Sequence, residues 1–116
     1  MKTFVSAKLH NLYVTDKSLR YHGSASIDAS LLKIAGIDPY EQVHIVNLSN
    51  GNRWVTYALP SEEGVFTLNG GGARLGEVGD TCIVIAYRQE EVFSGVTVVY
   101  CTPDNQVQEV LQYARS

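Results

Sequence analysis

The sequence lacks a long apolar run, an excess of basic side chains and a spaced set of metal ligands. Its longest apolar stretch, residues 82–87, is far shorter than the roughly 20 residues of a membrane-spanning helix, so we expect no membrane segment. The chain carries 12 acidic against 9 basic side chains, a net charge of -3, which argues against a nucleic-acid partner. The histidines, His10, His22 and His44, show no ligand spacing, so we expect no metal site.

Cysteine is also scarce, and we expect no secretory signal. Residues 1–10 contain no apolar stretch of the signal-peptide type. Cys82 and Cys101 both lie in apolar, strand-like runs. They could pair, but without a secretory signal we expect buried free thiols and a cytoplasmic protein.

The length and overall composition of the sequence predict one compact domain. The 116 residues suit a single domain over 1–116, and a chain that is 45% apolar and 18% charged can form a core.

The prevailing hydrophobic period is two, which is typical of half-buried strands. Val5, Ala7 and Leu9 alternate with polar residues, and Val43 and Ile45 do the same. Further β-rich stretches are 53–59, 65–68, 82–87 and 96–101. Between two strands, Asn50-Gly51 predicts a type I′ hairpin turn, because both central residues of that turn need positive φ.

Helices are few in this pattern. Asp28 as N-cap, an apolar stripe of Leu31, Leu32 and Ala35, and Gly36 at the end predict one short helix. A helical turn is expected over residues 16–19, and a fraying helix after Gln106.

A weak internal repeat relates residues 35–46 to residues 74–85. Each copy contains a turn, an acidic residue (Glu41 or Asp80) and an alternating strand. Two such units suggest a β-barrel with a pseudo-twofold axis, since closing the sheet removes its exposed edges.

Gly23-Ser24 has two interpretations. Such a dipeptide is common in loops. Alternatively, the Ser24 hydroxyl lies near the carbonyl carbon of Gly23, and a strained peptide there would let it convert the amide into an ester. A hydrolase triad is not expected, because no Gly-x-Ser-x-Gly motif surrounds this serine.

Residues 69–73, Asn-Gly-Gly-Gly-Ala, have the most unusual local composition. A glycine cluster is most often a flexible turn between strands. It does not continue as a phosphate loop, because no Gly-Lys-Ser/Thr follows. The remaining alternative is a backbone that approaches a carboxylate or oxyanion closely through its N–H groups.

Polar residues on two strands are the other candidates. Arg53 and Tyr57 share one strand face and Thr56 lies on the other; they either decorate the surface or form an anion clamp with a phenol that can donate a proton. Lys8 and His10 share a face of the first strand, and a solvated face is the simpler interpretation.

Taken together, the order and spacing of these residues resemble the bacterial pyruvoyl-dependent aspartate 1-decarboxylases, from about residue 1 to residue 87. The resemblance is carried by motifs that are weak singly and specific in combination: Lys8-Leu9-His10, Tyr21-His22-Gly23-Ser24, Asp28, Asn50-Gly51, Arg53, Thr56-Tyr57, Asn69-Gly70 and Gly79-Asp80.

The resemblance implies a mainly β fold, a double-psi β-barrel with one or two short helices. It implies a homotetramer with active sites between subunits, and it leaves room for a maturation factor. It also implies a proenzyme: Ser24 attacks the carbonyl of Gly23, and the chain separates into residues 1–23 and residues 24–116. Residue 24 then becomes a pyruvoyl cofactor, with release of ammonia.

The implied activity is decarboxylation of L-aspartate to β-alanine and CO2 through a Schiff base, feeding pantothenate biosynthesis. In the family pattern Tyr57 matches the proton donor, and Lys8 and Arg53 match residues that hold carboxylate. Thr56 matches a residue that assists processing and contacts substrate. Gly70, Gly71 and Gly72 match the loop that lines the substrate pocket, Asn69 a residue beside the cleaved peptide, and His10 a residue that orients its neighbours.

The chain departs from this family at two places. The family usually has Asn-Gly-Ala-Ala-Ala where residues 69–73 stand here, and the segment after Tyr87 matches poorly. The alternative function is a non-catalytic double-psi barrel that binds a small molecule, or DNA. Such a module shares the Gly-Asp turn but does not need Gly23-Ser24, Arg53 and Tyr57 together.

Overall fold

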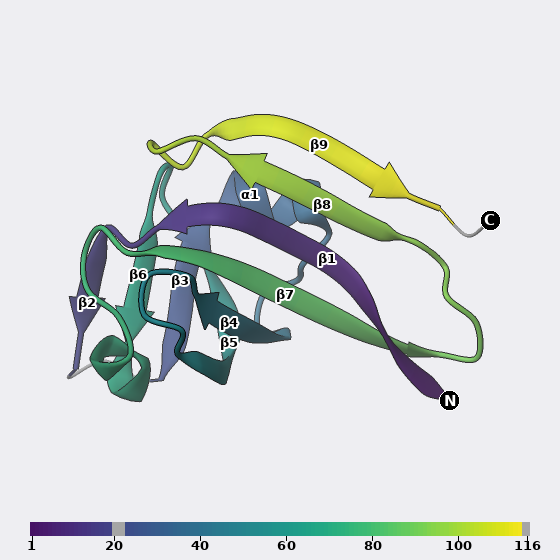
Figure 1. Ribbon diagram of the computed structural model, residues 1–116, viewed down its shortest axis with the longest axis horizontal. Coiled ribbons are helices and arrows are strands. Elements are labelled where there is room, and N and C mark those ends of the chain that lie inside the picture. The colour runs from purple at the N-terminus through teal and green to yellow at the C-terminus, as the bar shows by residue number, and fades with distance from the viewer. Residues whose placement is uncertain (20–22, 115–116) are drawn as a thin grey trace.

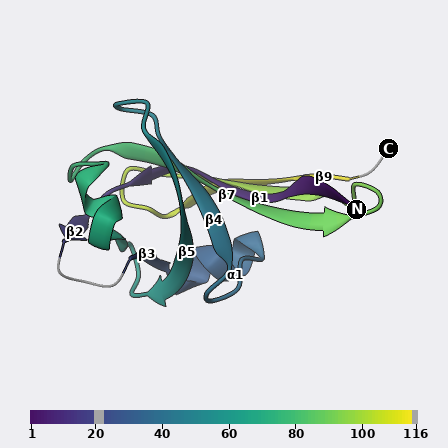
Figure 2. The ribbon, with the colours of Figure 1, turned by 90° about the horizontal axis from the view of Figure 1, so that it is seen from below.

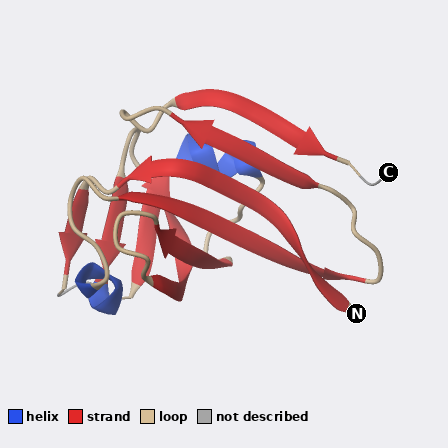
Figure 3. Cartoon of the chain, viewed as in Figure 1, coloured by secondary structure: helices blue, strands red, loops and turns tan. Residues whose placement is uncertain are grey.

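The computed structural model describes residues 1–19 and 23–114 (Figure 1). Over this part of the chain, strands dominate and two short helices accompany them (Figure 3). The elements are, in order, β1 (Lys2–Tyr13), β2 (Asp16–Ser18), β3 (Ser24–Asp28), α1 (Ala29–Ala35), β4 (Gln42–Asn47), β5 (Arg53–Ser61), β6 (Phe66–Asn69), the 3₁₀ helix η1 (Gly70–Arg74), β7 (Thr81–Glu90), β8 (Val96–Cys101) and β9 (Val107–Tyr113).

The strands form one sheet in the order β2-β6-β3-β5-β4-β7-β1-β8-β9. Three neighbouring pairs are parallel: β2 with β6, β3 with β5, and β1 with β8. The mainly β prediction is confirmed, and a sheet in which strands distant in sequence pair in parallel is compatible with a double-psi barrel. Figure 2 shows the layer of β1, β7 and β9 from its edge, with the turn between β4 and β5 on one side and α1 on the other.

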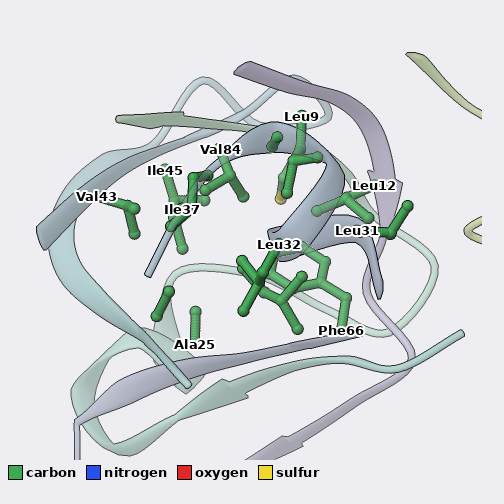
Figure 4. Close-up of a cluster of buried hydrophobic side chains, with 14 of the residues drawn as sticks. Leu9, Leu12, Ala25, Leu31, Leu32, Ile37, Val43, Ile45, Phe66 and Val84 are labelled. Carbon is green, nitrogen blue, oxygen red and sulfur yellow. The ribbon is translucent and has the colours of Figure 1, made fainter. Parts of the chain in front are cut away.

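The core follows the period of two in the sequence. Ala7 and Leu9 of β1 and Val43 and Ile45 of β4 are buried, as their alternation predicts. Figure 4 shows side chains from the strands and from α1 pointing into one interior. Helix α1 also has its predicted ends: the Asp28 carboxylate accepts from the Ser30 backbone N–H, and Gly36 takes a left-handed conformation with φ 79°.

The internal repeat reappears as two turns of the same design. In the first turn the Glu41 N–H donates to the Asp38 carbonyl and the Glu41 carboxylate accepts from the Asp38 N–H. In the second, Asp80 and Glu77 make the same two contacts. The strands that follow these turns, β4 and β7, pair antiparallel with each other.

Two helix predictions are wrong. Residues 16–18 form strand β2, because they pair with β6 of the sheet, where Asp16 faces Thr67. The segment after Gln106 forms strand β9, which folds back on β8 through the turn at residues 102–106. Asn105 supplies the left-handed residue of that turn, with φ 57°. In both cases pairing with a strand of the sheet overrides the local pattern.

The Asn50-Gly51 hairpin exists, but its turn is not type I′. The loop joins β4 to β5 over residues 48–52, and the Asn47 N–H donates to the Asn52 carbonyl at 2.8 Å. Gly51 has φ 81°, and Asn50 does not share the positive φ. The Asn50 side-chain oxygen instead accepts from the Asn52 N–H at 2.9 Å, so a longer loop is closed by a side chain.

Candidate active site

Ser24 begins β3, and its residue is only 3% exposed, whereas Gly23 before it is exposed. Asn69 faces Ser24 across the antiparallel β3–β6 pair and is equally buried. The Asn69 Nδ2 donates to Ser24 Oγ and to Ser26 Oγ, at 2.9 Å each. The sequence therefore places a hydroxyl at the entrance of the strand, and β6 supplies an amide that fixes the position of its oxygen. Tyr21 and His22 of the matching motif lie outside the described residues.

On its other side, β3 runs parallel to β5. The first paired residues are Ala25 and Ala58, and Ser24 and Tyr57 stand one position earlier on each strand. Two positions before the Ala25–Ala58 pair, Gly23 precedes β3 and lies level with Thr56 of β5. Because neighbouring strands lie about 4.8 Å apart, the Gly23-Ser24 peptide enters the sheet alongside Thr56 and Tyr57. The Tyr57 ring stacks on Tyr40, with ring centroids 6.0 Å apart.

The glycine cluster after Asn69 is more ordered than the loop interpretation predicts. Residues 70–74 form the 3₁₀ helix η1, and the Leu75 N–H donates to the Gly72 carbonyl at 3.0 Å. Gly70 is buried and has φ 63°. Gly72 packs against Trp54, such that an added Cβ would stand 3.0 Å from the indole nitrogen. Absence of a side chain at Gly72 thus permits a close approach to Trp54.

Arg53 lies at the start of β5 and reaches across two neighbouring strands. Its Nη2 donates to the Tyr87 hydroxyl of β7 at 2.9 Å and lies 3.3 Å from His44 Nδ1 of β4. The sequence analysis did not single out His44 or Tyr87. Alternation along β4 and β5 places His44 opposite Val55, on the face that carries Arg53, and this signal could have drawn attention to His44.

Lys8 and His10 of β1 lie farther along the sheet. Lys8 pairs with Ile85, Ile85 with His44, and His44 with Val55, so three inter-strand steps, roughly 14 Å, separate Lys8 from β5. The structure places Lys8 and Arg53 on one sheet face but does not bring them into contact.

His10 contacts a residue from the poorly matching part of the chain. Its ring packs on Tyr100, with centroids 4.9 Å apart. Burial, and next the charge of Lys8, lower the pKa of His10 below its usual value. A lowered pKa favours the neutral form of the ring.

The two cysteines are free and buried, as predicted. Burial, with a smaller contribution from Asp80, raises the pKa of Cys82 to about 12. Burial and Asp28 raise the pKa of Cys101 to about 11. Neither thiol forms a nucleophilic thiolate near neutral pH. Over residues 1–19 and 23–114 there is no cluster of three side chains able to hold a metal, and no helix long and apolar enough to cross a membrane.

By fold and site, the chain is a mainly β protein with a buried serine at the start of β3 and an arginine that contacts a tyrosine and a histidine on neighbouring strands. It belongs to the aspartate decarboxylase family, because the model of that family matches residues 1–108. It is 50% identical over 90 residues to the aspartate 1-decarboxylase of Acaryochloris marina, covering 76% of this chain and 69% of the relative. It is 45% identical over 118 residues to that of Trichormus variabilis, covering 97% and 93%. The aspartate 1-decarboxylase 2 of Gloeobacter violaceus is 50% identical over 91 residues, covering 77% and 73%.

Proposed function

We propose that this protein decarboxylates L-aspartate to β-alanine and that its cofactor is a pyruvoyl group made from Ser24. The name of the relatives supports the substrate. The observation that carries the cofactor is the buried Ser24 hydroxyl, which accepts from Asn69 at 2.9 Å and directly follows an exposed glycine. A hydroxyl that is fixed next to an accessible peptide can attack that peptide's carbonyl carbon.

The proposed processing reaction needs only the atoms of the chain and one water molecule. Ser24 Oγ bonds to the carbonyl carbon of Gly23, the peptide C–N bond breaks, and the Ser24 nitrogen takes the proton. Loss of the Ser24 α-proton then breaks the ester C–O bond and releases the Gly23 carboxylate. Water hydrolyses the resulting dehydroalanine to a ketone and ammonia. The products are residues 1–23 and residues 24–116.

The residues around Ser24 fit such a keto group. Asn69 Nδ2 is a buried amide donor beside the Ser24 side chain. The Ser24 Oγ leaves with Gly23, and the keto oxygen that water adds at the α-carbon of residue 24 would be a new acceptor near this donor. A ketone next to an amide supplies an electron sink for the carbon that loses its carboxylate. Thr56 stands beside Gly23 and assists processing.

The cationic side chains provide the substrate contacts in this proposal. Arg53 and Lys8 bind carboxylates, because a guanidinium and an ammonium form charge-assisted hydrogen bonds with them. Tyr57, next to Ser24 along the paired strands, returns a proton to the substrate carbon. His10 orients its neighbours, and the backbone of Gly70, Gly71 and Gly72 lines the pocket.

We further propose that the site is completed between subunits of a homotetramer. Roughly 14 Å separates Lys8 from β5 within one chain. The two residues therefore stand three strands apart and make no contact within one chain, and in this proposal one of the two cations comes from a neighbouring copy. A maturation factor is a further partner that would act on the exposed Gly23.

Mass spectrometry of the denatured protein tests the proposal. We expect two fragments divided between Gly23 and Ser24, with a carbonyl at the start of the larger one that reacts with a hydrazine or hydroxylamine. Ser24→Ala should remain whole and make no β-alanine. An intact Ser24→Ala chain that still produced β-alanine would overturn the proposal. Tyr57→Phe should be processed normally and turn over more slowly, and unchanged turnover would remove Tyr57 from proton transfer.

A further inference from the structure

Arg53 is the centre of a polar cluster that joins three strands. It projects from β5, and its Nη2 contacts the hydroxyl of Tyr87 on β7 at 2.9 Å and Nδ1 of His44 on β4 at 3.3 Å. The His44 and Tyr87 rings also pack edge-on against each other, with centroids 4.8 Å apart and an angle of 64°. Two rings that contact each other and the same guanidinium restrict the rotamers available to Arg53.

The direction of these bonds determines what the cluster can do. A guanidinium only donates, so the Tyr87 oxygen accepts, and its own hydroxyl proton remains directed elsewhere. Nδ1 of His44 accepts only in the tautomer that carries its proton on Nε2. Both contacts use Nη2, which leaves Nη1 and Nε to meet a ligand.

A cavity of about 480 Å³ borders this cluster. His44 and Tyr87 line it together with Gln42 and Arg88, and the one acidic residue in its wall is Glu41. The cavity has ample room for a small dicarboxylic amino acid, and it gives solvent and ligands access to the two rings that hold Arg53.

We propose that Tyr87 and His44 are positioning residues that hold the Arg53 guanidinium ready for the substrate carboxylate. This inference rests on the proposed role of Arg53 in binding substrate. An exposed arginine has many rotamers, and a ligand must select one of them at an entropic cost. Holding the side chain before binding reduces that cost and therefore strengthens substrate binding.

The first test is the kinetics of Tyr87→Phe in the processed enzyme. The ring and its contact with His44 are kept, and only the hydroxyl is lost. We expect KM for aspartate to rise about 5- to 20-fold, kcat to stay within about twofold, and self-cleavage to be unchanged. Tyr113→Phe, which removes a hydroxyl from the exposed strand β9, is the matched control and should leave KM unchanged.

A pair of substitutions at His44 tests the second contact. Asn carries an acceptor near the position of Nδ1, so His44→Asn should keep KM close to that of the unmodified enzyme. His44→Ala removes the acceptor and should raise KM. If Tyr87→Phe does not fold, the two His44 variants still test whether this cluster positions Arg53. Equal KM values for the Asn and Ala variants would overturn the role of His44.

The double variant separates positioning from a general structural effect. If Tyr87 acts through Arg53, adding Tyr87→Phe to Arg53→Gln should cause no further rise in KM, since the guanidinium is already absent. Additive effects of the two substitutions would overturn the inference. If Arg53→Gln raises KM and Tyr87→Phe does not, this inference alone fails. If Arg53→Gln leaves KM unchanged, the proposed role of Arg53 in substrate binding fails with it.

Discussion

The side-chain amide of Asn69 donates to Ser24 Oγ across the β3–β6 pair, at 2.9 Å and in a buried setting. The same nitrogen also donates to Ser26 Oγ. Because a hydroxyl that attacks a carbonyl must be held in one orientation, the proposed self-cleavage should depend on this contact.

Replacing Asn69 by Ala should therefore slow self-cleavage about 10-fold, because a hydroxyl that is no longer held samples orientations that cannot attack the Gly23 carbonyl. Denaturing electrophoresis over time after synthesis measures the fraction of cleaved chain. Ser26→Ala is the control, because it removes the second acceptor and leaves the contact with Ser24 intact. Cleavage of Asn69→Ala at the normal rate would remove Asn69 from processing.

The glycine cluster offers a matched pair of substitutions. An added Cβ at Gly71 meets no atom within 4 Å, whereas one at Gly72 stands 3.0 Å from Trp54 Nε1. Gly71→Ala should raise the free energy of unfolding by about 0.5–1 kcal/mol, because alanine reduces the freedom of the unfolded chain. Gly72→Ala should gain less or lose stability, since the indole must shift. Urea unfolding measures both, and Trp54, the sole tryptophan, reports the shift by fluorescence. Equal gains would contradict the close approach.

Asp80 predicts how stability depends on pH. The hydrogen bond from the Asn47 side chain is the largest cause of its lowered pKa, followed by the Glu77 N–H. A carboxyl whose pKa is lower in the folded state stabilises the fold above its unfolded pKa, about 3.9, and loses that contribution as pH falls through the folded value. Asp80→Asn should therefore flatten the loss of stability below about pH 4. An unchanged slope in urea unfolding at several pH values would contradict this. Asp28, whose pKa is also lowered, keeps part of the slope.

The buried cysteines should be unreactive in the native protein. With pKa values raised to about 12 for Cys82 and about 11 for Cys101, the thiolate fraction at pH 8 is very small. A colourimetric disulfide reagent should titrate neither thiol in buffer and both in 6 M urea. Rapid reaction of the native protein would show that one of these strands opens readily.

Local sequence patterns predicted the elements that are defined by residues close together in the chain. The alternation of β1 and β4 and the caps of α1 at Asp28 and Gly36 all depend on residues close together in the chain. Strands β2 and β9 were predicted as helices because their strand character comes from pairing, as between Asp16 and Thr67. No window of sequence contains such a partner.

In the candidate site, too, some residues can be recognised from the local sequence, whereas their contacts come from the fold. Ser24 and Arg53 stand out by residue type and neighbours, but what fixes them comes from far along the chain. The contact of Ser24 with Asn69 spans 45 positions, and that of Arg53 with Tyr87 spans 34. Tyr87 ends an apolar run and looks like any strand residue until the sheet brings β7 near β5. The resemblance to a family supplied Asn69 in advance, and only the fold supplied Tyr87.

Tyr40 gives a final prediction, drawn from the internal repeat. It occupies the position that Gly79 occupies in the second turn, and both have positive φ, 67° and 93°. Its N–H donates to the Ala58 carbonyl at 2.7 Å, which holds the turn in this conformation. A left-handed conformation costs an ordinary L-residue roughly 1–2 kcal/mol, whereas Asn adopts it readily. Tyr40 is 74% exposed, so its stacking on Tyr57 offsets only part of that cost.

Two substitutions separate the backbone strain from the ring contact. Tyr40→Ala removes the ring and keeps the strain, so it should be less stable than the unmodified protein by the value of the stack, about 0.5 kcal/mol. Tyr40→Asn removes the ring and relieves the strain, so it should exceed Tyr40→Ala by roughly 1 kcal/mol in urea unfolding. If the two variants are equally stable, the left-handed conformation is not strained and the ring alone accounts for tyrosine at this turn.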